Sequence, residues 1–207
     1  MKRVNVGAAA FLAVAWGIVS YIMLVVEPGM GFSSPTDFFD AVKVVAGNAS
    51  SAWFVGNLAY LAIPVSVMAL VRSSNHRELI WSGVLSSLLF LLLGSIGLVG
   101  RQLPSLLPSE EDVVRAVAAT LPIRLAVLKT TVVIFGVFAW AATRVDRDVD
   151  RWSRAWRALG WALPVLCVAF LFVFIPVPLL FLAWAVALTI QEVRATTRKG
   201  SAPQPAA

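Results

Sequence analysis

The side chains of this sequence that are most able to bind a ligand are a lysine and an arginine in an apolar segment. Lys129 lies about seven residues into the apolar run 122–142, and Arg124 lies near the beginning of that run. Ionisable side chains within a membrane span are costly and often mark a ligand or ion pathway. An ammonium and a guanidinium together would suit a carboxylate, a phosphate or a lipid headgroup.

Other polar side chains fall at a similar depth in neighbouring apolar runs. Asn57 and Tyr60 are three residues apart, so they share one face of a helix. The complete set of candidate ligand-binding residues is Lys129, Arg124, Arg101, Asn57, Tyr60, Tyr21 and Glu27. Two alternatives give this set no binding role. Lys129 could extend its stem to the interface while Asn57 bonds between helices, or Lys129 could pair with Glu27.

This chain lacks the residues that most familiar active sites need. With one His (His76) and one Cys (Cys167), the sequence cannot build a bis-His haem site, an iron–sulfur cluster, a structural zinc site or an intrachain disulfide. No nucleophile elbow, zinc-protease motif or Walker loop is present. We therefore expect no metal, no cofactor and no catalytic residue, although an unrecognised membrane enzyme stays an open alternative.

The elements that must position these residues are membrane spans. Only 14% of the residues are charged and 59% are hydrophobic, with a mean hydropathy of +0.85. About 20 apolar residues cross the hydrocarbon core as a helix. Six runs approach this length, at about 8–26, 52–71, 79–98, 122–142, 158–175 and 177–192. The predicted fold is an all-α, polytopic transmembrane helical bundle.

The predicted bundle is one domain over 1–192, followed by a disordered cytoplasmic tail over 193–207. Pro176 and Pro178 separate the last two runs and favour a tight hairpin between them. One long kinked helix, which would leave five spans, is the alternative. Trp16 and Trp184 fall near the middle of the first and last spans. Packing between those two helices is the plainer explanation for them, and a bound apolar ligand is the rarer one.

Two loops carry the signals of short amphipathic helices on the outer face. The first has Ser34 as N-cap and Pro35 at the first helical position. In the second, Ser109 is the N-cap, and Glu111 and Arg115 are spaced to pair across one turn.

The basic residues predict the orientation of the bundle. If the N-terminus is cytoplasmic, 12 of the 17 Lys and Arg residues fall on the cytoplasmic side and five fall on the outer side. This split predicts a multi-pass protein of the plasma membrane with both termini cytoplasmic. The expected partners are the lipid bilayer, with anionic lipid at the cytoplasmic face, and a membrane protein, but no nucleic acid.

For function, the sequence favours a non-enzymatic accessory, assembly or regulatory component of a membrane complex. The alternative is binding or transport of a small anion or amphiphile through an outer-leaflet polar pocket around Lys129.

Overall fold

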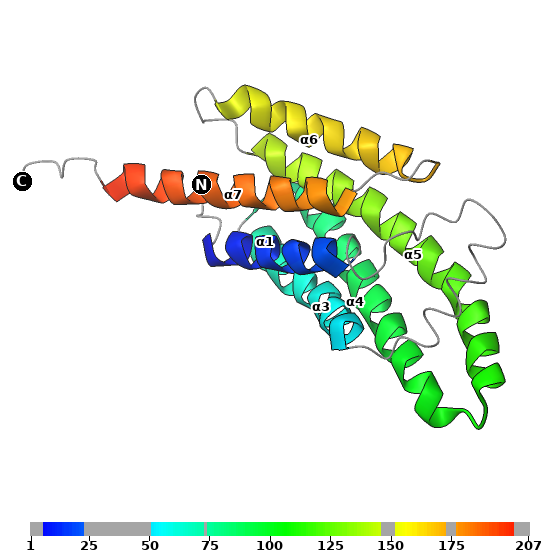
Figure 1. Cartoon of the computed structure of the whole chain (residues 1–207). Coiled ribbons are helices and arrows are strands. Elements are labelled where there is room, and N and C mark those ends of the chain that lie inside the picture. The colour runs from blue at the N-terminus through cyan, green and yellow to red at the C-terminus, as the bar shows by residue number, and fades with distance from the viewer. Residues whose placement is uncertain (1–5, 23–50, 73, 146–151, 173–176, 201–207) are drawn as a thin grey trace, which may run out of the picture.

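The structure of the chain is a computed structural model, which describes residues 6–22, 51–72, 74–145, 152–172 and 177–200. Every regular element in these ranges is a helix, and none is a strand. The helices are α1 (Val6–Tyr21), α3 (Ser51–Arg72), α4 (Arg77–Leu106), α5 (Glu110–Val145), α6 (Trp152–Ala169) and α7 (Val177–Gly200), as Figure 1 shows. The prediction of an all-α fold is confirmed.

Four of these helices are long and apolar enough to cross a membrane. The candidate spans are Phe54–Arg72 in α3, Arg77–Gly100 in α4, Glu110–Arg144 in α5 and Val177–Arg194 in α7. The apolar helices Val6–Tyr21 and Ala158–Ala169 are shorter. Helices therefore occupy all six predicted positions, and four of them reach the length that a crossing needs within the described residues.

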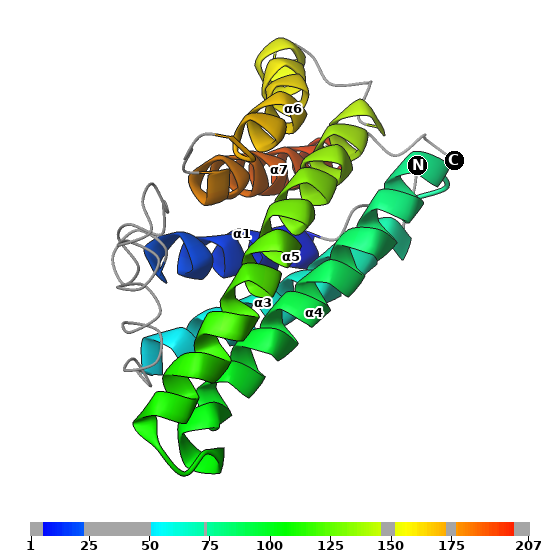
Figure 2. The same ribbon diagram turned by 90° about the vertical axis from the view of Figure 1, so that its right-hand side faces the viewer.

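The helices form a closed ring in chain order. Each helix packs on the next along the chain, and α7 also packs on α1. Figures 1 and 2 show α1 and α7 running in opposite directions, so α1 begins and α7 ends at the same end of the bundle, called here the terminal end. The opposite end, where α4 turns into α5, is called the hairpin end. Antiparallel neighbours with short connections are typical of helical bundles.

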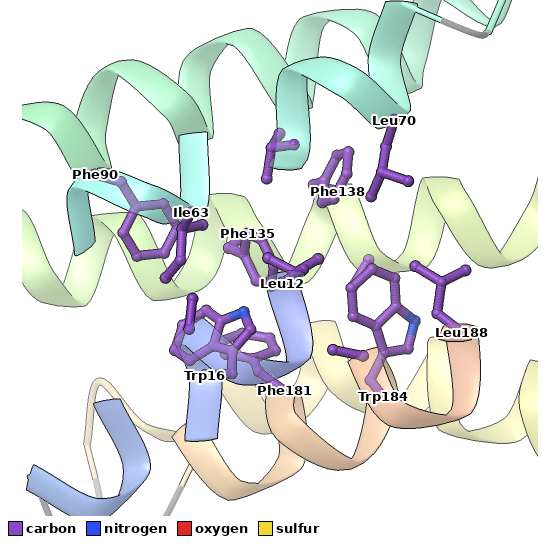
Figure 3. Packing of buried hydrophobic residues seen from close by; sticks show 14 of the residues in the cluster. Leu12, Trp16, Ile63, Leu70, Phe90, Phe135, Phe138, Phe181, Trp184 and Leu188 are labelled. Atoms are coloured by element: carbon purple, nitrogen blue, oxygen red, sulfur yellow. The ribbon is translucent and has the colours of Figure 1, made fainter. Parts of the chain in front are cut away.

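An aromatic core joins helices that are far apart in the sequence. The indole of Trp16 on α1 lies 4.7 Å from the ring of Phe181 on α7, measured between centroids, and 5.1 Å from Phe135 on α5. Trp184 on α7 lies in the same cluster, as Figure 3 shows. The predicted packing of the first helix on the last is confirmed.

The two buried indoles differ in their hydrogen bonding. Trp184 Nε1 donates to Thr143 Oγ1 on α5 at 3.3 Å, and that hydroxyl donates in turn to the carbonyl of Ala139 at 2.7 Å. Trp16 Nε1 is buried and has no hydrogen-bond partner within the described part of the chain. Trp184 is therefore fixed by a polar contact as well as by packing, whereas Trp16 is held by the rings around it.

Helices α4 and α5 are longer than a bilayer is thick. Their 30 and 36 residues correspond to about 45 and 54 Å at 1.5 Å per residue. Even a tilt of about 40° leaves about 34 and 41 Å along the membrane normal, against a core of about 30 Å. The end of this hairpin, residues 99–123, is called here the hairpin arm.

The hairpin arm has a small apolar core of its own, separate from the main cluster. Within the arm it consists of the buried and partly buried side chains Leu103, Leu107, Val113, Val114, Val117, Ala118 and Leu121, and Leu125 on α5 continues it. At its turn, Ser109 Oγ accepts the N–H of Asp112 at 3.2 Å, which confirms the predicted N-cap. The predicted pair of Glu111 and Arg115 is also confirmed.

Two boundaries differ from the sequence prediction, and one predicted helix is not tested. The second surface helix is not a separate element, because α5 continues through Pro122 into the span. Proline removes one backbone hydrogen bond there, and the turns on both sides remain helical. At the C-terminus, α7 continues to Gly200, so the first part of the predicted disordered tail is helical. The first surface helix, predicted around Ser34, lies outside the described residues.

The last two helices are separate elements. α6 ends at Ala169 and α7 begins at Val177, with Pro178 in its first turn, where proline is tolerated. They contact each other and run in opposite directions in Figure 1. This arrangement fits the hairpin and not one long kinked helix.

Candidate functional site

Three helices meet at one polar contact near the hairpin end. Asn57 on α3 is only 2% exposed, and Arg124 on α5 donates from Nη2 to Asn57 Oδ1 at 3.5 Å. A Cβ atom added at Gly97 on α4 would lie 1.9 Å from the same Oδ1. The Asn57 side chain therefore fits between α3 and α4 because position 97 has no side chain. We call Asn57, Gly97 and Arg124 the polar junction.

The polar junction sets the register of three helices. A buried amide is costly unless it is hydrogen-bonded, so Asn57 favours the arrangement that brings Arg124 within reach. The donor–acceptor distance is long for an N–H···O bond, which makes this contact weaker than a close charge-assisted pair. Gly97 is not among the predicted ligand-binding residues. The signal in the sequence was the run of Gly94, Gly97 and Gly100, which would allow close helix approach although the three-residue spacing is not that of the GxxxG motif.

Arg124 also marks a depth along α5. It lies 20 residues before Arg144, a separation of about 30 Å along a helix. The guanidinium of Arg144, at the other end, lies 4.7 Å from the ring centroid of Trp140 and 3.9 Å from the carboxylate of Glu78. Trp140 in turn contacts Trp161 at 5.4 Å between centroids. Tryptophan with arginine is typical of a membrane–water interface. The separation of the two arginines is close to the thickness of a hydrocarbon core.

Lys129 is directed to a different helix from Arg124. Its Nζ donates to the carbonyl of Leu171 at 3.2 Å, just past the end of α6. The chain closes tight turns there, with the N–H of Leu171 bonded to the carbonyl of Val168 and that of Phe172 to Ala169, each at 3.0 Å. An ammonium at a helix C-terminus is favourable because the macrodipole is negative there. The two cations of the predicted pocket therefore contact different parts of the bundle, Arg124 on α3 and Lys129 at the end of α6.

The remaining predicted site residues have other surroundings or lie outside the described residues. Tyr60 is buried in the core, with its ring stacked on Phe90 at 6.1 Å between centroids. Tyr21 is 60% exposed at the end of α1. Glu27 and the side chain of Arg101 lie outside the described residues. Of the seven candidates, the structure brings Asn57 and Arg124 into contact with each other.

Replacing Lys129 by methionine is expected to lower the free energy of unfolding by about 0.3–1 kcal/mol, because the substitution removes the charge that caps α6. Chemical unfolding of the purified protein in detergent would measure the change. Lys129→Arg is the control and should retain most of the effect, since it keeps a cation near the carbonyl of Leu171. A more stable Lys129→Met protein would show instead that Lys129 only extends to the interface.

Within the described ranges, no three His, Cys, Asp or Glu side chains come together in a way that could hold a metal ion. Cys167 is buried on α6, where it faces Gly136 on α5, and a Cβ added at Gly136 would lie 2.8 Å from the sulfur. This contact is a close helix packing, like that of Gly97 with Asn57.

Comparison with known proteins finds no relative of this chain. No protein-family model, no curated protein and no solved structure matches the chain.

Proposed function

We propose that this chain is a non-enzymatic component of a membrane complex, with an accessory, assembly or regulatory role. The observation that supports this proposal is the hairpin arm, whose two helices are longer than the hydrocarbon core is thick and which has an apolar cluster of its own. In this proposal the arm extends past the hydrocarbon core. Ordering the residues of such an extension costs conformational entropy, and the extension contributes nothing to crossing the bilayer. Its natural use is to present a rigid surface to another protein.

The surface of the hairpin arm suits recognition. From Glu110 to Thr120 its exposed residues on α5 are polar or small, namely Glu110, Glu111, Arg115, Ala119 and Thr120, and the exposed Pro122 and Ile123 follow them. Both signs of charge occur within two turns, a pattern that gives specificity between partners more than affinity. The helices beneath it are held by the N-cap at Ser109 and by the polar junction, so the surface is preorganised.

In this proposal the chain crosses the plasma membrane six times, with α1 and α6 completing the spans and both termini in the cytoplasm. The basic residues Arg72, Arg77, Arg144 and Arg194 occur at the terminal end, where positive charge favours the cytoplasmic side. Anionic lipid would meet them there. The hairpin arm then faces outward, which places its partner on the outer surface of the membrane.

The test is co-purification of the full chain from its native membranes, compared with a charge-swapped variant. The double substitution Glu111→Lys with Arg115→Glu keeps an i,i+4 pair and the net charge but reverses the surface pattern. We expect a protein that co-purifies at a fixed ratio with the unchanged chain and is reduced about tenfold in the variant, equivalent to about 1.4 kcal/mol. A chain that purifies alone, or a partner unaffected by the swap, would refute the proposal.

A second candidate function is binding of a small anion or amphiphile at the hairpin end. The observation that favours it is the polar junction, which holds a guanidinium beside a buried amide at the depth expected of headgroups. Lys129, bonded to Leu171, is the cation that α5 presents on the side of α6. Titration with a short-chain phospholipid would test this candidate, and an affinity unchanged by Arg124→Gln would remove it.

A further inference from the structure

Two opposite charges lie side by side on α4 and α5 at the terminal end. Arg144 Nη1 on α5 is 3.9 Å from the carboxylate of Glu78 on α4, and the two side chains are 42% and 68% exposed. An ion pair this long and this exposed contributes little to stability, so both groups stay accessible to a ligand. We call Glu78 and Arg144 the charged pair.

Three tryptophans adjoin the charged pair. Trp81 follows Glu78 by three residues and Trp140 precedes Arg144 by four, so each ring lies one turn from its charged neighbour on the same helix face. Because α4 and α5 pack as an antiparallel hairpin (Figure 2), both rings lie on the side of the pair that faces the hairpin end. Trp161 on α6 adds a third ring, which packs against Trp140. Trp81 and Trp161 are exposed.

The charged pair also lies where the apolar sequence of several helices stops. The candidate spans of α3, α4 and α5 have Arg72, Arg77 and Arg144 at their ends on this side, and all three arginines are exposed. From the pair toward the hairpin end, α4 presents the indole of Trp81 and then the exposed Leu85. Charge, then indole, then aliphatic side chain is the order that matches a phospholipid from its headgroup to its acyl chains.

The two charges select the kind of headgroup. The guanidinium of Arg144 presents a fork of N–H donors that suits a phosphate. The carboxylate of Glu78 would repel a headgroup that is only anionic, whereas it accepts hydrogen bonds from a primary ammonium. An ethanolamine phospholipid carries both groups on one short link. We propose that the charged pair binds the headgroup of an ethanolamine phospholipid, with its acyl chains passing over Trp81 and Trp161.

This inference goes beyond the proposed function. The lipid would bind at the terminal end, whereas the proposed protein partner binds the hairpin arm, so either proposal can fail without the other. The inference also differs from a general attraction of anionic lipid to arginine, because a carboxylate takes part and the favoured headgroup has no net charge.

Native mass spectrometry of the full chain in detergent tests the proposal, with equal amounts of three short-chain phospholipids added together. The three share their acyl chains and carry phosphoethanolamine, phosphocholine or phosphoglycerol headgroups. We expect about tenfold more bound ethanolamine lipid than either of the others. Any other order, including equal binding of all three, would overturn the proposal. Free glycerophosphoethanolamine bound as tightly as the lipid would overturn it too, since the indoles would then contribute nothing.

Two substitutions separate the roles of the charges. Glu78→Gln leaves Arg144 without its acid, so the anionic phosphoglycerol lipid should become the preferred ligand. A misfolded chain would not gain binding of one lipid, so this switch reports on the site itself. Arg144→Gln removes the donor to the phosphate and should lower binding of ethanolamine lipid about tenfold. An ethanolamine preference that survives Glu78→Gln would show that the lipid binds elsewhere.

Arg77→Gln is the matched control. Arg77 adjoins Glu78 in the sequence and is also exposed, but it forms no ion pair or ring contact within the described part of the chain. The substitution removes the same charge from the same end of the bundle, and it should leave the ethanolamine preference intact. Equal losses for Arg77→Gln and Arg144→Gln would mean that lipid responds to surface charge alone, and would overturn the site.

Discussion

Replacing Trp16 by alanine is expected to destabilise this protein by about 3 kcal/mol, measured as the free energy of unfolding in mixed micelles. The indole is 1% exposed and touches rings from three other helices, namely Phe90, Phe135 and Phe181. In a bilayer the unfolded reference also holds the side chain in an apolar medium, so the transfer term is small. The loss comes from dispersion contacts and the cavity left behind, which places it at the lower end of the range for buried tryptophan.

Trp161→Ala is the matched control for that experiment. Trp161 is the same residue type on a helix of the same bundle, but its side chain is 58% exposed. Its removal loses the ring contact with Trp140, so the unfolding free energy should fall by about 0.5–1.5 kcal/mol, less than for Trp16. If Trp16→Ala were as mild as this control, the aromatic cluster would not be the site that joins α1, α4, α5 and α7.

The central packing of this bundle was visible in its sequence. Tryptophan is more usual at interfaces than in the middle of a span, so Trp16 and Trp184 indicated that the first and last helices face each other. The same residues imply a need for hydrogen-bond acceptors, and Thr143 supplies one for Trp184. Patterns of this kind depend on residue type and depth alone, which explains why they can be read without coordinates.

The length of α5 could not be read in the same way. Ser109 and the acids after it mark a helix start, and Pro122 is a common helix boundary, so a surface helix and a separate span were the natural expectation. The apolar contacts of Val113, Val117 and Leu121 with α4 keep the two parts in one line. Proline usually ends or kinks a helix, but here tertiary packing on α4 keeps α5 continuous through Pro122.

The direction of Lys129 was also beyond the sequence. The position of Lys129 within a predicted span made it a candidate site residue. That position does not say which neighbouring helix a long side chain will reach. The carbonyl of Leu171 becomes its acceptor because α6 ends at that level of α5. Such a partner depends on where another helix stops, which the composition of either segment does not reveal.

Replacing Gly97 by alanine is expected to destabilise the protein by about 2 kcal/mol. Alanine normally stabilises a helix when it replaces glycine, so the expected effect has the opposite sign. The new methyl group would lie 1.9 Å from Asn57 Oδ1, so the amide must move. Moving it weakens the bond from Arg124 and leaves a polar group in an apolar surround. The measurement is again unfolding in mixed micelles.

Gly100→Ala provides the control on the same helix. A Cβ at position 100 meets nothing within 4 Å, so this change should be neutral or stabilising by about 0.5–1 kcal/mol through helix propensity. The two glycines lie one turn apart, and they differ in whether a side chain from α3 occupies the space in front of them. Equal effects at both positions would mean that Asn57 does not fill the gap.

A double-mutant cycle then assigns the loss to the contact itself. Asn57→Ala alone removes a buried amide and leaves a small cavity between α3 and α4, so it should also destabilise. In that background the methyl group of Gly97→Ala has room and fills part of the cavity. The second substitution should therefore be neutral or favourable, with a coupling energy of about 2 kcal/mol between the two sites. Simple additivity would show that Gly97 and Asn57 act independently, and it would remove the polar junction as the contact that aligns α3, α4 and α5.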